Sequence, residues 1–234
     1  MPPKINYATL AKLTVKRPVD RLAYISNLCK SKLVLDIGCF DETALNKRNT
    51  EHWLHGRISK NARQVIGIDC SSIIPDEGIR TSETSKIFRG DGTDIPPEYL
   101  KNNFDIVVAG EFIEHIENPL SFFKNMKKKF PGQTLLISTP NGACFANMLL
   151  GTIGREVQHP DHLHIFSYKI LNTLCMRANF QDWEIIPYRF YATEMILQSN
   201  GMQKILVIVV ERFIRLVEKM FPLLSFGYVV HAKL

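Results

Sequence analysis

The sequence predicts the α/β fold class, with helices on both faces of a mostly parallel sheet. Short apolar runs rich in β-branched residues alternate with amphipathic segments, which is the pattern of parallel strands joined by crossover helices. The runs are almost continuously apolar, as in strands that are covered on both faces. The chain has 234 residues, enough for one such domain with a sizeable core and too few for two ordinary ones. We therefore expect a single domain over residues 1–234.

The elements of the first half are predicted in chain order. Residues 19–30 have the apolar spacing of a helix, so we expect a helical segment within residues 1–30. Asn118 and Pro119 are a suitable N-cap and first-turn pair for a helix that runs through Lys129. The strands of this half are expected at residues 33–37, 65–69, 86–89, 104–108 and 134–138.

The second half is expected to add a helix capped by Ser167 and a strand near residues 183–186. A long amphipathic helix is predicted at about residues 202–221, within an insertion of residues 201–222 that precedes a last strand at 227–233. Such a helix usually packs on its own sheet. Because its first turns are strongly apolar, a dimer seam, a lid over an acceptor pocket and a contact with a membrane surface are alternatives.

In a doubly wound, Rossmann-like sheet, ligands bind beyond the carboxyl ends of the parallel strands. The residues of chemical interest in this sequence stand at those ends. They are Asp36, Gly38 and Cys39 after the first strand, Asp69 and Cys70 after the second, Asp91 and Gly92 after the third, and Gly110 and Glu111 after the fourth. We therefore expect one ligand site at this edge of the sheet.

These residue types suit a nucleoside that carries a charged amino-acid tail. Gly38 has no Cβ, so the backbone can approach a ligand closely there. The carboxylate of Asp69 can accept hydrogen bonds from two neighbouring ribose hydroxyls, and Asp91 can accept one from an exocyclic adenine amine.

Four motifs occur in a fixed order: VLDIGC at 34–39, GID at 67–69, GDG at 90–92, and FDIV at 104–107, which leads into EFIEHIENP at 111–119. Together they resemble the successive motifs of class I S-adenosylmethionine-dependent methyltransferases, in the group that includes ubiquinone-biosynthesis and sugar methyltransferases. The resemblance covers about residues 20–190, and its specificity lies in the order of the four motifs.

The resemblance implies a seven-stranded sheet whose last strand is antiparallel, with S-adenosyl-L-methionine as cofactor. It implies that Asp36 and Gly38 line the methionine moiety, Asp69 holds the ribose and Asp91 holds the adenine. Backbone carbonyls of residues 109–111, which include Gly110 and Glu111, would face the cofactor amine. Cys39, Cys70 and Gly92 are expected beside them.

Two features depart from the pattern of the family. After Gly38 the family usually has further glycines, whereas this chain has Phe40, Asp41 and Glu42, so Phe40 is expected to pack over the ligand or the loop to follow ordinary backbone angles. The distance in sequence from Asp36 to Asp69 also exceeds the roughly 20 residues of a dinucleotide-binding fold. Residues 47–62 are therefore expected to form an extra helical excursion, and NAD is disfavoured.

Three histidines are candidate general bases: His115, His162 and His164. His115 follows the fourth strand, next to the expected methyl donor, where a simple approach to the next helix is the alternative. His162 and His164 belong to a polar loop that could instead hold a divalent metal or serve only as a connection. No second set of ligands is evident in the sequence, so no metal site is expected.

Composition narrows the setting of the chain. The formal net charge of +6 favours an anionic partner, but the densest basic run, residues 127–129, falls at the end of a predicted helix, where cations are favourable anyway. Without an aromatic and basic strip, nucleic acid is not expected as a partner. The five cysteines form no CxxC pair and no signal peptide is evident, so a cytoplasmic location is expected. The apolar run 205–210 is far shorter than the about 20 residues of a transmembrane helix.

The function expected from these observations is methyl transfer from S-adenosyl-L-methionine, most simply to an oxygen of a small molecule or a saccharide, including a bacterial polysaccharide-type acceptor. A quinone, a lipid-linked acceptor or a nitrogen acceptor is the second reading. A third reading is a non-catalytic cofactor-binding or assembly protein, which the altered turn at Phe40 leaves open.

Overall fold

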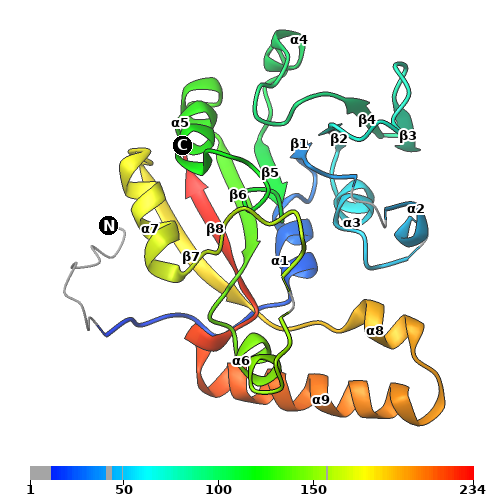
Figure 1. Cartoon of the computed structure of the whole chain (residues 1–234). Helices are drawn as coiled ribbons and strands as arrows, with labels where there is room; N and C mark the ends of the chain where they lie inside the picture. The colour runs from blue at the N-terminus through cyan, green and yellow to red at the C-terminus, as the bar shows by residue number, and fades with distance from the viewer. Residues whose placement is uncertain (1–11, 41–43, 49, 157) are drawn as a thin grey trace.

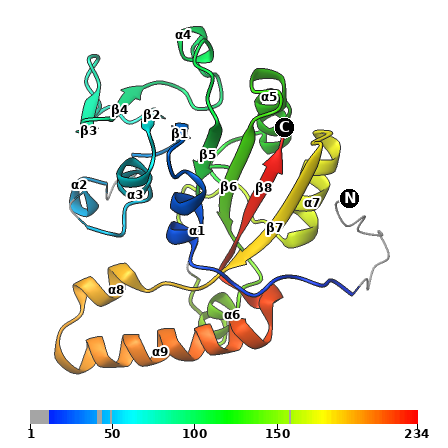
Figure 2. The same ribbon diagram turned by 180° about the vertical axis from the view of Figure 1, so that it is seen from behind.

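The computed structural model describes residues 12–40, 44–48, 50–156 and 158–234. These residues form one eight-stranded sheet with helices on both faces (Figures 1 and 2). From one edge to the other, the strands are β3 (Ile79–Ser82), β4 (Ser85–Arg89), β2 (Gln64–Asp69), β1 (Leu33–Ile37), β5 (Ile106–Gly110), β6 (Thr134–Pro140), β8 (Gly227–Lys233) and β7 (Asp182–Tyr188). The predicted α/β class and all seven predicted strands are confirmed.

The predicted number of seven strands was wrong, because strand β3 adds an eighth at the edge of the sheet. Within the part of the chain that the structure describes, it pairs with β4 alone, in the antiparallel direction, with Ile79 opposite Ile87. An edge strand needs no apolar run, and β3 is polar apart from Ile79 and only partly buried. The signal that could have found it is the short polar turn at residues 83–84, which joins two segments of alternating polarity.

The middle of the sheet is parallel: β1 pairs with β2 and β5, β2 with β4, and β5 with β6. Strand β8 lies between β6 and β7 and runs antiparallel to both. Val230 in β8 is opposite Ile137 of β6 on one side and Ile185 of β7 on the other. The predicted antiparallel last strand is confirmed.

Helices cover both faces of the sheet, as predicted. On one face, α5 (Pro119–Lys129) and α7 (Tyr168–Arg177) bury Phe123 and Leu171 in a cluster with Leu35. On the other face, α1 (Arg21–Leu28) and α3 (Leu54–Asn61) bury apolar side chains against β1, β2 and β5; they are Ile25, Cys29 and Ile58, packed with Val34, Val65 and Val108. The alternation of strand side chains between faces gives the sheet two separate apolar layers.

The predicted helix starts are confirmed at two caps. The Asn118 side chain accepts a hydrogen bond from the Ser121 N–H at 3.0 Å, and the Ser167 hydroxyl accepts one from the Ile170 N–H at 3.4 Å. Both bonds satisfy backbone donors that the first turn of a helix leaves free.

The long connection from β1 to β2 is helical, as predicted, with α2 (Ala44–Lys47) before α3. Phe40 is buried and packs edge-on against Trp53, with ring centroids 6.4 Å apart. Asp41 and Glu42, which stand where the family usually has glycines, lie outside the described residues.

Two helices form the insertion between β7 and β8: α8 (Thr193–Gln198) and α9 (Gly201–Met220). They lie along the lower side of the molecule in Figure 1, where α9 packs next to α6 (Phe145–Gly151) and α8 packs against α9. The predicted helix at 202–221 is confirmed. No helix among the described residues is both long and apolar enough to span a bilayer. The remaining short helices are α4 (Pro97–Leu100) and the 3₁₀ turn η1 (Pro222–Leu224).

Candidate active site

A cavity of about 1130 Å³ opens at the carboxyl ends of the parallel strands. All nine residues that the sequence predicts to bind a cofactor line it: Asp36, Gly38, Cys39, Asp69, Cys70, Asp91, Gly92, Gly110 and Glu111. The fold brings them together because β1, β2, β4 and β5 end at the same edge of the sheet.

Gly38 turns the chain sharply after β1. Its φ angle is +65°, a left-handed conformation that L side chains rarely adopt. A Cβ at this position would lie 2.4 Å from Cδ2 of Phe112, so the position has no room for a side chain. The Gly38 N–H donates a hydrogen bond to the Ile68 carbonyl at 2.9 Å, which ties the ends of β1 and β2 together.

Asp69 organises the two loops beside it. Its Oδ2 accepts a hydrogen bond from the Phe40 N–H and its Oδ1 accepts one from the Ser71 N–H, each at 2.9 Å. Such bonds fix the orientation of the carboxylate at the end of β2. Asp91, after β4, is more exposed, and its Oδ1 accepts hydrogen bonds from the Thr93 N–H at 2.7 Å and the Thr93 hydroxyl at 2.8 Å.

Asp36 is buried and hydrogen-bonded to a residue that the sequence did not point to. Nδ1 of His55, on α3, lies 2.8 Å from Oδ2 of Asp36. Nε2 of the same ring lies 2.9 Å from the Ser85 hydroxyl on β4. The imidazole thus links β1 to β4 at the wall of the cavity, which both His55 and Asp36 line.

Glu111 stands at the end of β5 in a left-handed conformation, with φ +54°. Such a backbone angle is costly for a residue other than glycine and persists where surrounding contacts hold it. The hydroxyls of Tyr188 and Tyr191 donate to its Oε1 at 2.9 and 2.8 Å, and Nη1 of Arg21 lies 3.2 Å from its Oε2. Burial raises the pKa of the Tyr191 phenol, which therefore stays a hydrogen-bond donor.

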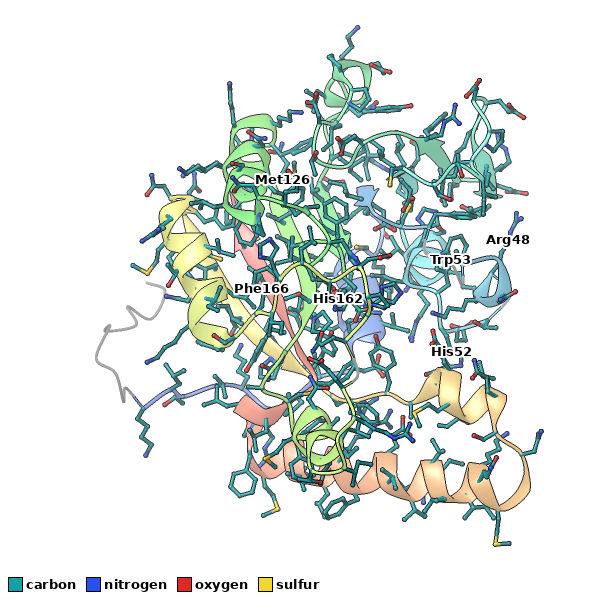
Figure 3. The ribbon with its side chains drawn as sticks, viewed as in Figure 1. Arg48, His52, Trp53, Met126, His162 and Phe166 are labelled. Atoms are coloured by element: carbon teal, nitrogen blue, oxygen red, sulfur yellow. The ribbon has the colours of Figure 1, made fainter. Side chains whose placement is uncertain are left out.

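Two of the three predicted base candidates line the cavity, His115 and His162. Their ring centroids are 4.7 Å apart at an interplanar angle of 75°. Burial lowers the pKa of His162, as do the neighbouring His115 and His159. His164 does not line the cavity; its Nε2 donates to the Glu117 carbonyl at 3.3 Å. Figure 3 shows His162 on the loop that precedes α7, and Trp53 at the start of α3.

Glu114 lies beside these histidines and was not among the predicted site residues. It is buried, with 1% of its surface exposed, yet it lines the cavity. Burial raises the pKa of its carboxyl to about 8, and the neighbouring Glu111 adds to the shift. The signal in the sequence was its place in the EFIEHIENP motif, next to His115.

The residues that the sequence missed share one property, which is that their partners lie far away in the chain. Arg21, Tyr188 and Tyr191 reach Glu111 from α1, from β7 and from the segment after β7, and His55 reaches Asp36 from α3. No spacing rule joins such positions before the fold is known.

Several solved structures share this fold. A SAM-dependent methyltransferase from Archaeoglobus fulgidus is 20% identical, with a TM-score of 0.52 over 90% of this chain and 90% of that one. The methyltransferase domain of the bacterial protein CtHen1 is 17% identical, with a TM-score of 0.54 over 92% and 98%. A Thermotoga maritima protein described as a possible histamine N-methyltransferase is 14% identical, with a TM-score of 0.57 over 92% and 87%. At these identities the likeness concerns the fold. No curated protein of similar sequence matches the chain.

The residues of the cavity fit an adenosyl cofactor. Three carboxylates, Asp36, Asp69 and Asp91, line one space, and the chain turns beside it at Gly38 with a left-handed backbone. The cavity volume lies near the upper end of the roughly 300–1000 Å³ that is typical of small-ligand sites. A family model described as a methyltransferase domain matches residues 7–185. The chain belongs to this family of methyltransferase domains, for which S-adenosyl-L-methionine is the methyl donor.

Proposed function

We propose that this chain, acting as a single domain, transfers the methyl group of S-adenosyl-L-methionine to an oxygen of a small molecule or saccharide. The observation that carries the proposal is the convergence of Asp36, Asp69 and Asp91 on one cavity that histidines also line. When bound, the cofactor supplies a methyl group that its sulfonium has already activated. The protein then needs chiefly to hold the acceptor close and to exclude water.

The residues of the chain divide into two groups along the cavity wall. The end of β2 presents Asp69 to ribose hydroxyls, and the loop after β4 presents Asp91 to the adenine amine. The segment after β5 and the loop before α7 present His115 and His162, whose imidazoles suit the acceptor side. Since burial lowers the pKa of His162, its ring is neutral near pH 7 and can accept a proton or a hydroxyl hydrogen bond.

A second acceptor class, a quinone or a lipid-linked molecule, is favoured by one observation on α9. The outward face of this helix is apolar, with exposed side chains at Met202, Ile205, Leu206, Val209, Val210, Phe213, Leu216 and Met220. Both acidic residues of the helix, Glu211 and Glu218, are buried instead. The usual arrangement of a surface helix is therefore reversed.

The exposed charges of α9 are all basic. Lys204, Arg212 and Lys219 are exposed on the same helix, which gives it the composition of a helix that lies in the plane of an anionic lipid surface. Arg215 of α9 also lines the cavity. Contact between α9 and a membrane from the cytoplasmic side would bring the cavity close to acceptors held in lipid.

The experiment that tests the function has two steps. Calorimetry with S-adenosyl-L-methionine measures binding, and detection of S-adenosylhomocysteine then measures turnover with saccharides, small hydroxyl compounds, quinones and amines. Binding and turnover with a hydroxyl acceptor support the proposal. Turnover only with amines contradicts the choice of oxygen. Binding without turnover on any acceptor supports a non-catalytic protein, and the absence of binding contradicts the proposal as a whole.

A further inference from the structure

Glu114, His115 and His162 bring three potential metal ligands together in the wall of the cavity. A carboxylate oxygen of Glu114 and one ring nitrogen from each histidine all lie within 4.8 Å of one another. The residues come from the segment after β5 and from the loop before α7, so only the fold brings them together. The sequence analysis predicted no metal site because no second set of ligands was evident. In the fold, ligands from two distant segments of the chain come together.

The carboxylate of Glu114 is the feature that calls for a positive partner. It is 1% exposed, and no described residue gives either of its oxygens a hydrogen bond of normal geometry, although the Thr139 hydroxyl lies close to it. A buried carboxyl without a partner is costly as an anion, so it keeps its proton unless it is paired with a cation or coordinates a metal. Both oxygens of Glu114 are available for that purpose.

The neighbouring acidic residue shows the contrast. Glu111 accepts hydrogen bonds from Tyr188 and Tyr191 and lies 3.2 Å from Nη1 of Arg21, so its charge is matched within the protein. The guanidinium of Arg21 therefore forms its ion pair with Glu111. Arg21 attracts the Glu114 carboxylate through its charge but donates no hydrogen bond to it, and the ligand atoms grouped with Glu114 within 4.8 Å are those of His115 and His162.

Asp36, Cys39 and His55 form a second cluster of potential metal ligands. Unlike Glu114, the imidazole of this cluster already has its hydrogen-bond partners within the protein. Nδ1 of His55 is bonded to Asp36 and its Nε2 lies 2.9 Å from the Ser85 hydroxyl, so the ring has no free nitrogen. Burial raises the pKa of the Cys39 thiol, which disfavours the thiolate that a metal requires. The cluster is a closed hydrogen-bond network.

We propose that Glu114, His115 and His162 bind a divalent transition-metal ion, and that an open coordination position of this ion holds the acceptor oxygen. Two imidazole nitrogens and one carboxylate suit ions such as Mn²⁺, Co²⁺ and Zn²⁺, and three protein ligands leave positions for water or substrate. The histidines would then be ligands, because an imidazole bound to a metal cannot also take the acceptor's proton. The role for the acceptor rests on the proposed function, whereas the binding of the ion does not.

Neutral imidazoles are the form that binds a metal. The Nδ1 of His162 lies 3.1 Å from the Gln158 side-chain oxygen, a contact that orients the ring and leaves Nε2 for a ligand.

The test is a titration of the chelator-treated chain with Co²⁺, followed by visible absorption, with no methyl donor or acceptor present. We expect one equivalent to bind with the absorption bands of nitrogen and oxygen ligands. Glu114→Gln and His162→Ala should each weaken Co²⁺ binding at least about tenfold. Even the loss of a residue that only supports a metal ligand lowers metal affinity by about tenfold or more. The matched control His164→Ala changes a histidine of the same loop that lies outside the cavity, and should bind Co²⁺ like the wild type.

Circular dichroism and thermal unfolding show whether each variant is folded, and two variants on different segments guard against the loss of one. The proposal is overturned if Co²⁺ at roughly millimolar concentration does not bind, or if both variants bind it as tightly as His164→Ala. A chain that binds Co²⁺ through these residues but does not bind S-adenosyl-L-methionine would keep the metal site and refute the proposed function. The reverse result would refute only the metal site.

Discussion

Nδ1 of His55 lies 2.8 Å from Oδ2 of Asp36, and both side chains are almost fully buried. Since a carboxylate only accepts hydrogen bonds, Nδ1–H is the donor, and Nε2 is free to accept from the Ser85 hydroxyl at 2.9 Å. The carboxylate at the end of β1 is thus held by a helix that belongs to the following connection.

Removing this imidazole should destabilise the fold. In His55→Ala, Asp36 would remain buried without its hydrogen-bond donor, and leaving such a group unsatisfied costs about 1–3 kcal/mol. Urea unfolding measures the change in the free energy of unfolding. The control His52→Ala replaces an exposed histidine close by and should change it by less than about 0.5 kcal/mol. Equal losses in the two variants would contradict the role given to the pair.

Asp69→Asn should weaken cofactor binding more than it weakens the fold. The amide keeps one acceptor oxygen, so it loses one of the two hydrogen bonds from the Phe40 and Ser71 N–H groups, and it also loses the charge offered to ribose hydroxyls. Hydrogen bonds to charged groups contribute about 1.5–3 kcal/mol, so affinity for S-adenosylhomocysteine should fall at least about tenfold. Calorimetry measures it, with the exposed Asp76→Asn as control. An unchanged affinity would remove Asp69 from the ribose site.

Glu218 should make stability depend on pH between about 4.5 and 7. Burial raises the pKa of its carboxyl to about 7, from an ordinary value of 4.5. In this window the folded chain keeps a proton that the unfolded chain has lost, so the free energy of unfolding falls as pH rises and levels off above pH 7.

Urea unfolding of the wild type and Glu218→Gln over this pH range isolates the effect. As the pH rises from 4.5 to 7, the free energy of unfolding of the wild type should fall relative to that of Glu218→Gln. Glu117→Gln, which changes an exposed residue, is the matched control. A constant difference for Glu218→Gln would show that its carboxyl is ionised normally.

The apolar face of α9 should bind anionic vesicles. Phe213→Asp combined with Leu216→Asp puts charge on two exposed positions of this face and should lower cosedimentation with phosphatidylglycerol vesicles. The matched control, Leu163→Asp with Ile170→Asp, changes two exposed apolar residues elsewhere and should bind like the wild type. If the wild type forms a dimer in gel filtration that the first pair abolishes, and never binds vesicles, the face is a dimer seam instead.

The sequence was most informative where strands are buried on both faces. Continuous apolar runs such as residues 33–37 mark those strands, and the rule for ligand sites at their carboxyl ends led directly to Asp36, Asp69 and Asp91. Strand β3 was missed because an edge strand carries no such run. The sequence predicted His164 as a general base on the same grounds as His162, because residue type alone does not say which way a loop side chain points.

The pairing of Arg21 with Glu111 shows why part of the site stays hidden in the sequence. An arginine in an amphipathic helix predicts an exposed charge, whereas this one is nearly buried beside Tyr188 and Tyr191. The pairing depends on β7 and the segment after it reaching the end of β5. Such tertiary contacts need the coordinates of the whole sheet.

The position of β8 between β6 and β7 has a consequence for how the chain acquires its structure during synthesis. Among the strands of the described residues, β7 pairs along its length with β8 alone, and Val19 adds a single bridge at Tyr188. The ribosome makes β8 some forty residues later, after α8 and α9. Until then β6 and β7 each present an open row of backbone donors and acceptors, the kind of edge on which chains aggregate. The nascent chain is therefore most vulnerable to self-association while the insertion is being translated.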